Sequence, residues 1–330
     1  MPNVLLSGFA DEAAPDKTID QQFSAMAALG LRYLSIRFID VGNGIKNVLE
    51  LTGNEYEVVR SRLEQFGLEI ASIGSPIGKV KLLDVDDGTS NRFVPFAQYL
   101  ESDVQAAIDA ANQLDTRLIR GFSFYHPRDT DPSACLDQAV EQIAGIVERC
   151  DAAGLTFGLE VEANLIGSTG TVLAEIHRQI NHPALVLIFD GGNLVSQGFD
   201  QSQILEQFRQ MIPGLGWMHV KDYLSSQKSR QVPGEYIDEE KLDQFVPADR
   251  GSTGHAAIFS ELTSHLPNIN QQLATRNIPG FFVDLEPHLR GGGQFGGYSG
   301  PDGMGIALKG LQRILDETKI SYDLRTLEDL

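Results

Sequence analysis

The sequence predicts an α/β fold of the (β/α)8 type, a TIM barrel that forms a single domain over residues 1–330. Three observations support this. Eight short runs of aliphatic and β-branched residues are spread along the chain, and each is nearly continuous, as a strand covered on both faces requires. Longer amphipathic stretches with helical spacing separate these runs. The length of 330 residues is only modestly above the roughly 250 residues typical of the fold.

The strands and helices are expected to alternate from end to end. The strand runs are VLLSGF from Val4, RYLSIRF from Arg32, EIASIGS from Glu69, TRLIRGF from Thr116, TFGLEV from Thr156, LVLIFD from Leu185, GWMHVK from Gly216 and GFFVDLE from Gly280. The helical patterns cover residues 18–29, 54–66, 99–114, 135–153, 172–180, 202–211, 256–276 and 305–318. An open doubly wound sheet is the alternative. It is disfavoured because the first strand lacks the glycine-rich turn of nucleotide-binding sheets.

Two long loops are expected after the seventh and eighth strands. The first runs from Tyr223 to about His255 and carries two proline-containing turns. The second is the glycine-rich segment GGGQFGGYSGPDG, from Gly291 to Gly303. Loops of this kind at a barrel mouth often act as lids. The first loop could instead be a contact between subunits.

Composition limits the partners that the chain can take. A formal charge of −19 argues against a nucleic-acid partner, which needs a basic surface, and against anionic membranes. The apolar runs are too short to span a membrane, and MPNVLLSGFADE lacks the positive region of a secretion signal. Two cysteines cannot form a disulfide framework. We therefore expect a cytoplasmic protein with a small-molecule partner, which could also form a homo-oligomer.

Four segments place an acidic or imidazole side chain where a buried strand should end. They are GLEVEAN, LVLIFDGGN, GWMHVKD and FFVDLEPH, and the side chains are Glu160, Asp190, His219 and Glu286. Active sites of (β/α)8 barrels lie at the carboxyl ends of the strands. Three carboxylates and one imidazole suit one divalent ion, such as Mn²⁺ or Mg²⁺, with Co²⁺ or Zn²⁺ as alternatives. The sequence therefore predicts a mononuclear metal site.

Such a site favours proton transfer next to a carbonyl group. Four protein ligands on an octahedral ion leave two positions, which a hydroxyl and a carbonyl oxygen of a sugar would fill. The ion would polarise the carbonyl and stabilise an enediolate while a carboxylate removes the proton from carbon. Glu160 and Glu286 approach from different strands, so one could take the proton and the other return it. These two residues are the predicted catalytic pair.

The chain resembles the xylose isomerase-like TIM barrels, in the branch of sugar phosphate isomerases and epimerases. The resemblance runs nearly end to end and is carried by SGFADE (7–12), the Ile36–Arg37 pair, SIGSPIGK (72–79), LEVEAN (159–164), FDGGN (189–193), HVKDY (219–223) and LEP (285–287). The family's metal ligands map onto Glu160, Asp190, His219 and Glu286, and its acid–base carboxylates onto Glu160 and Glu286. Glu162 is a rival for Glu160, because strand alternation puts both on one face.

Other positions are weaker candidates for contacts with the substrate. In related epimerases a histidine three residues after the strand-six aspartate often touches substrate, and here this residue is Asn193. Glu12 could bind a sugar hydroxyl, and His126, after the fourth strand, could also contact the substrate. An anionic group of the substrate could meet the basic side chains Arg37, Lys79, Lys221 and Arg290.

The predicted function is therefore a metal-dependent isomerase or epimerase acting on a sugar or sugar phosphate. A dehydratase of the inosose type is the first alternative, because it begins with the same proton removal. A non-catalytic sugar-binding barrel comes next. A hydrolase like the apurinic endonucleases is least favoured, because those enzymes need further histidines and this chain has seven. The sequence does not identify the sugar, its phosphorylation or the physiological metal.

Overall fold

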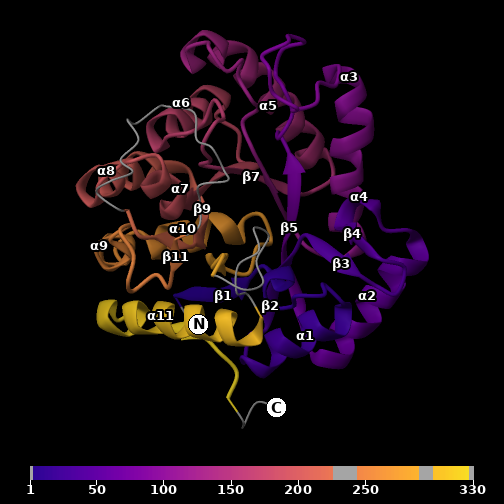
Figure 1. Ribbon diagram of the computed structural model, residues 1–330, viewed down its shortest axis with the longest axis vertical. Coiled ribbons are helices and arrows are strands. Elements are labelled where there is room, and N and C mark those ends of the chain that lie inside the picture. Colours follow the sequence, from indigo (N-terminus) through magenta and orange to yellow (C-terminus); the bar gives the residue numbers. More distant parts are fainter. Residues whose placement is uncertain (1–2, 226–243, 290–299, 327–330) are drawn as a thin grey trace.

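In the computed structural model, residues 3–225, 244–289 and 300–326 are described. Parallel strands at the centre are surrounded by helices (Figure 1). This arrangement confirms the predicted (β/α)8 TIM barrel. The barrel strands are β1 Val4–Gly8, β2 Tyr33–Ile36, β5 Glu69–Ile77, β6 Leu118–Gly121, β7 Thr156–Glu160, β8 Leu185–Asp190, β9 Leu215–Val220 and β12 Phe282–Leu285.

Hydrogen-bonded neighbours run in the order β1-β12-β9-β8-β7-β6-β5-β2, and all these pairs are parallel. A bridge between Phe9 and Ser35 joins the first strand to the second and closes the barrel. In this register His219 on β9 lies opposite Asp190 on β8 and Asp284 on β12. The pairing therefore brings the ends of the last four strands to one side of the barrel mouth.

The helices lie outside the strands, close to their predicted positions. Their bounds are α1 Ile19–Ala28, α2 Gly53–Phe66, α3 Phe96–Tyr99, α4 Gln105–Gln113, α5 Leu136–Ala152, α6 Gly170–Ile180, α7 Gly191–Ser196, α8 Gln201–Met211, α9 His255–Leu262, α10 Leu266–Ala274 and α11 Pro301–Thr318. A π-helical turn, Leu100–Val104, joins α3 to α4. No helix within the described ranges is long and apolar enough for a membrane crossing.

The single helix predicted over residues 256–276 is wrong, because the structure has α9 and α10 there with a break between them. Pro267 lies in the first turn of α10. Proline has no amide hydrogen and its ring clashes with a preceding helical turn, so it favours the start of a new helix over the interior of a long one.

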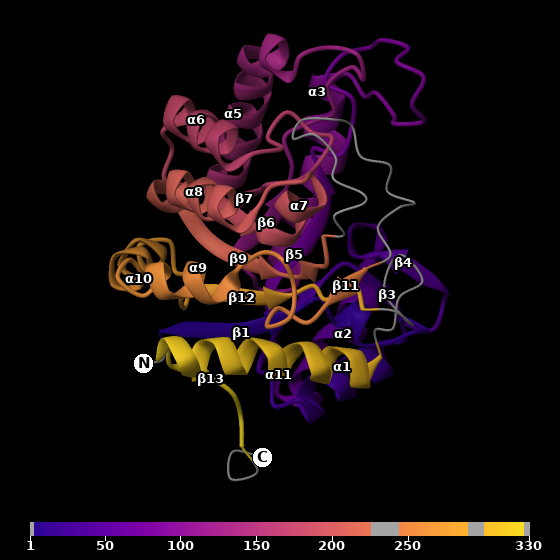
Figure 2. The ribbon, with the colours of Figure 1, turned by 60° about the vertical axis from the view of Figure 1, so that its left-hand side comes forward.

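Three small elements extend the barrel in ways that the sequence did not indicate. The antiparallel strands β3 Phe38–Asp40 and β4 Ile45–Asn47 form a hairpin after β2. Strand β13, Tyr322–Asp323, pairs with β1, so the first and the last strands of the described chain lie side by side (Figure 2). Strands β10 Asp222–Tyr223 and β11 Phe245–Val246 pair and form the base of the first long loop.

Much of both long loops lies outside the described residues. This holds for residues 226–243 in the loop from Tyr223 to His255, and for residues 290–299, which include most of the glycine-rich segment. Arg290, a candidate for binding an anionic group, is among them. The expected role of each loop as a lid stays a prediction.

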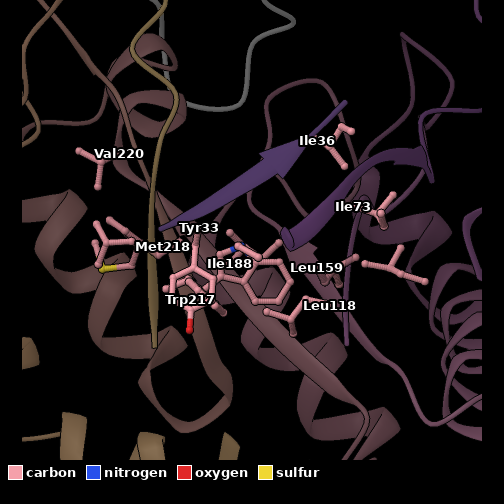
Figure 3. Packing of buried hydrophobic residues seen from close by; sticks show 14 of the residues in the cluster. Tyr33, Ile36, Ile73, Leu118, Leu159, Ile188, Trp217, Met218 and Val220 are labelled. Atoms are coloured by element: carbon pink, nitrogen blue, oxygen red, sulfur yellow. The ribbon is translucent and has the colours of Figure 1, made fainter. Parts of the chain in front are cut away.

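Buried hydrophobic side chains from many strands pack together in the core, and Figure 3 shows some of them. Trp217 on β9 is fully buried and is the single tryptophan of the chain. Its ring occupies the space that a side chain at Gly158, on β7, would need: a Cβ there would lie 2.0 Å from the indole ring. Glycine at position 158 therefore allows a large aromatic ring to fill the barrel.

Substitution of Gly158 by alanine should destabilise the fold. The added methyl group must displace a rigid ring in a close-packed interior, and overpacking of this kind costs about 1–3 kcal/mol. Gly53→Ala is the matched control, because a Cβ at Gly53 meets nothing within 4 Å. Urea denaturation should show a lower midpoint for Gly158→Ala and a change within about 0.5 kcal/mol for Gly53→Ala. Equal midpoints for Gly158→Ala and the wild type would contradict this account of the core.

Candidate active site

The structure brings the four predicted ligand residues together at the barrel mouth. Glu160 ends β7, Asp190 ends β8, His219 lies near the end of β9, and Glu286 directly follows β12. Each offers one ligand atom, and these atoms lie within 4.8 Å of one another. All four side chains are buried. Four strands that are consecutive around the barrel thus contribute one residue each to a single cluster.

The cluster fits a divalent ion. His219 Nδ1 and Asp190 Oδ2 are buried and, among the described residues, make no hydrogen bond of acceptable geometry, although Lys221 Nζ lies 3.0 Å from Asp190 Oδ2. Burying carboxylates without compensation is costly, and a cation that binds them removes that cost. Carboxylate oxygens with one imidazole nitrogen are ligands that Mg²⁺, Mn²⁺ and Zn²⁺ accept.

Local structure explains why Asp190 is held at this point. Its side chain accepts a hydrogen bond from the backbone amide of Asn193 and caps the short helix α7. The two glycines that follow permit a close approach, since a Cβ at Gly192 would lie 2.6 Å from the side chain of Lys221. The segment FDGGN therefore combines a helix cap with a tight turn, and it aims the second carboxylate oxygen at the cluster.

The imidazole of His219 is fixed by neighbours on its far side. The indole Nε1 of Trp217 lies 3.3 Å from His219 Nε2, and the ring of Phe9 lies edge-on with centroids 5.1 Å apart. Asp284, which accepts a hydrogen bond from Ser35, is 3.9 Å from the same nitrogen. These contacts leave Nδ1 directed at Glu160, 3.1 Å away. Partners behind a ligand histidine commonly set its orientation in this way.

Three cations surround the carboxylates. Lys221 Nζ lies 3.1 Å from Glu286 Oε2, Arg37 Nη1 is 2.7 Å from Glu286 Oε1, and Arg120 Nη1 is 3.4 Å from Glu160 Oε2. Burial alone raises the pKa of Glu160, but the charges of His219 and Arg120 lower this pKa to about 2. Burial likewise raises the pKa of Glu286, but Lys221, His288 and Arg37 hold this pKa well below its usual value. Both glutamates are therefore ionised at neutral pH.

Asp190 behaves differently, because burial raises its pKa to about 6. Lys221 lowers this pKa, while Glu160 and Glu286 raise it further. A carboxylate whose folded-state pKa exceeds its unfolded value of 3.8 makes the fold less stable as pH rises between those two values. Above pH 6 Asp190 is ionised and ready to bind a cation.

Metal affinity should consequently fall when the solution is acidified below about pH 6. A carboxylate ligand must lose its proton to bind the ion, so each pH unit below the pKa of Asp190 should lower the apparent affinity about tenfold. Above pH 6 this group should add no further dependence. Titration with Mn²⁺, followed by the emission of the lone Trp217 beside His219, measures this directly. An affinity that stays constant from about pH 5 to pH 7 would contradict the prediction.

A cavity of about 250 Å³ opens over the cluster. Glu160 and Glu286 line it, and so do four of the predicted substrate contacts, namely Arg37, Lys79, Asn193 and Lys221. Two others, Glu12 and His126, lie elsewhere: Glu12 is fully buried behind Arg37, and His126 Nδ1 is 2.9 Å from the carbonyl oxygen of Pro127. Their contact with substrate stays a prediction.

The structure distinguishes Glu160 from Glu162, the alternative candidate for the metal ligand at the end of β7. Glu162 also lines the cavity but is not one of the four clustered residues, and its carboxylate pairs with Lys79 Nζ at 2.9 Å. Strand β7 ends at Glu160. Beyond that point the alternation of strand faces no longer sets the direction of a side chain, so the two glutamates diverge. We retain Glu160 as the proposed ligand.

Arg37 is held by acidic neighbours. Its guanidinium pairs with Asp11 and Glu12, both at 3.1 Å, as well as with Glu286. Glu12 Oε1 is also 2.7 Å from His288 Nδ1, and its other oxygen accepts the backbone amide of His288. These contacts hold Arg37 in place, and Arg37 in turn holds the carboxylate of Glu286. The SGFADE and Ile36–Arg37 segments therefore position Glu286.

Sequence reasoning missed Arg120 and His288, both of which line the cavity. Arg120 had a readable signal, because a charged residue inside the apolar run TRLIRGF can only point into a barrel mouth or be paired. His288 had none. It lies beyond the end of β12 with a φ of 45°, a left-handed conformation that strand periodicity does not anticipate.

The chain belongs to the xylose isomerase-like TIM barrel family, whose model matches residues 23–269. Solved structures with the same fold include the IOLI protein with a bound zinc atom (TM-score 0.66, 11% identity, covering 96% of this chain and 99% of that one). Another is the probable 3-DHS dehydratase AsbF from Bacillus anthracis (0.64, 18%, 94% and 98%). A third is D-psicose 3-epimerase with D-tagatose from Clostridium cellulolyticum H10 (0.56, 15%, 97% and 98%). No curated protein matches the sequence.

Proposed function

We propose that this protein is a metal-dependent isomerase or epimerase that acts on a sugar or sugar phosphate. The observation that carries the proposal is the buried cluster of Glu160, Asp190, His219 and Glu286, of which Glu160 and Glu286 line the cavity. A divalent ion held there would supply Lewis acidity to the carbonyl group of a substrate. Glu160 and Glu286, both ionised, are the groups proposed to move the proton.

The two glutamates divide the proton transfer between them. Each is an acceptor without a proton at neutral pH, as a base that removes a proton from carbon must be. They come from β7 and from the end of β12, so they approach a substrate from different directions. One would take a proton from the carbon next to the carbonyl, and the other would return a proton to the neighbouring carbon or to the opposite face.

A dehydratase is the alternative that we keep. It would begin with the same proton removal and would then lose a hydroxyl group from the next carbon. The structural likeness to a probable 3-DHS dehydratase supports keeping this alternative. The likeness to D-psicose 3-epimerase supports the preferred proposal, and both are similarities of fold.

Uptake of deuterium from solvent tests the proposal. The protein is loaded with Mn²⁺, Mg²⁺, Co²⁺ or Zn²⁺ and incubated in D₂O with a panel of ketoses, ketose phosphates and polyhydroxy keto acids, and these compounds are followed by NMR. We expect exchange at the carbon next to the carbonyl, and its loss after removal of the metal with EDTA. Formation of an unsaturated or deoxy product would favour the dehydratase. Absence of exchange with every compound and every metal would contradict both the isomerase or epimerase proposal and the dehydratase alternative.

A further inference from the structure

Two buried arginines line the cavity, and they are held in different ways. Arg37 already pairs with three carboxylates. Its Nη1 lies 2.7 Å from Glu286, its Nε 3.1 Å from Asp11 and its Nη2 3.1 Å from Glu12. Arg120 Nη1 lies 3.4 Å from Glu160 and 3.9 Å from Glu286, and Nη2 donates to the carbonyl oxygen of Gly74 at 3.3 Å. Within the described part of the chain, Arg120 Nε has no hydrogen-bond partner. Charge-assisted N–H···O bonds normally measure about 2.7–2.9 Å.

Aromatic packing holds Arg120 in place where hydrogen bonds do not. Its guanidinium carbon lies 5.0 Å from the ring centroid of Phe9 and 4.8 Å from that of Phe122. Contacts of a cation with ring faces fix the plane of the guanidinium without using its N–H donors. Arg120 is 6% exposed and lines the cavity, as Glu160 and Glu286 of the cluster do. The side chain is therefore pre-oriented and retains donors for a ligand.

The other lysine and arginine side chains along the described part of the cavity wall are committed to carboxylates. Lys221 lies between Asp190 and Glu286, at 3.0 and 3.1 Å. Lys79 pairs with Glu162 at 2.9 Å. Arg120 is thus the permanent cation with the weakest existing partners. Its planar fork of donors can bind two oxygens of a carboxylate or of a phosphate. Its single charge balances a carboxylate, whereas a phosphate dianion would keep one uncompensated negative charge beside the acidic cluster.

We propose that Arg120 binds a carboxylate group of the substrate, so that the cavity takes a singly charged polyhydroxy acid in preference to a sugar phosphate. This inference rests on the proposed function for its choice of a polyhydroxy skeleton. It makes Arg120 the residue that determines specificity, while Glu160 and Glu286 move the proton.

Three probes with one carbon skeleton test the inference: D-gluconate, neutral sorbitol and sorbitol 6-phosphate. Calorimetric titration of the metal-loaded protein should show gluconate binding about 10- to 100-fold more tightly than sorbitol, as expected for one charge-assisted contact. Arg120→Met should remove this preference, and Arg120→Lys should restore part of it. Arg178→Met, at an exposed arginine paired with Glu175 on α6, is the control and should leave all three affinities unchanged.

Several results would overturn the inference. One is equal binding of gluconate and sorbitol by the wild type, and another is tighter binding of the phosphate. A preference for gluconate that survives in Arg120→Met would assign the carboxylate to another group. If Arg120→Met fails to fold, Arg120→Lys decides the question, because it should weaken gluconate binding and spare sorbitol. Failure here alongside deuterium exchange on neutral ketoses would leave the proposed function intact, whereas a preference for gluconate without exchange on any compound of the panel would reject that function alone.

Discussion

Replacement of Glu286 by glutamine is expected to abolish proton exchange between substrate and solvent while the barrel stays folded. The amide has the shape of the carboxylate but can neither accept the proton from carbon nor offer an anionic ligand. Loss of a positioned base costs about 10²- to 10⁴-fold in rate. The same result is expected for Glu160→Gln. The measurement is deuterium uptake in the metal-loaded protein, with circular dichroism as the check on folding.

Glu175→Gln is the matched control for these two variants. Glu175 lies on α6, where it pairs with Arg178, and its substitution should leave exchange unchanged. A Glu160→Gln/Glu286→Gln double variant that still exchanges protons between substrate and solvent would contradict the proposed mechanism. A folded but inactive single variant, beside an active control, would support it.

The second large effect is expected for His219→Ala, which should lose most of its bound metal. His219 supplies the only nitrogen among the four clustered residues, and its Nδ1 faces Glu160 at 3.1 Å. Removing a ligand should lower metal affinity by about 100-fold or more, since even partners behind a ligand are worth 10- to 100-fold. Elemental analysis after dialysis measures the loss. The stability of the outer helices should change far less than the metal content.

His265→Ala provides the comparison for this variant. His265 lies at the start of α10, in the outer helical layer, and its substitution should leave the metal content unchanged. Equal metal content in His219→Ala and His265→Ala would mean that the ion, if bound, lies outside the cluster. A loss of helical signal that parallels the loss of metal in His219→Ala would instead indicate unfolding.

The sequence predicted the parts of the site that lie on regular strands. Apolar runs indicated where β7, β8 and β9 end. The candidate ligands are the last residues of β7 and β8 and the residue before the last of β9. The register that places His219 beside Asp190 follows from the closed parallel sheet. The break between α9 and α10 was missed, because helical periodicity continues across Pro267.

Contacts that cross the barrel could not be predicted from the sequence. The commitment of Arg37 to Glu286 joins residues 249 positions apart. The orientation of Glu162 toward Lys79, and the position of His288, depend on backbone beyond the strand ends, where no periodicity applies. Arg120 lies within β6, and its charge inside an apolar run was visible in the sequence, but its contacts with the rings of Phe9 and Phe122 could not be predicted.

The central claim is that Glu160, Asp190, His219 and Glu286 together hold one divalent ion. The most direct measurement is an anomalous difference map from a crystal soaked in Mn²⁺. We predict one peak per chain, bonded to these four side chains. A crystal with no peak in the cavity would contradict it. So would a peak held by Glu12 and His288, which with Glu286 form the second group of side chains that could bind a metal.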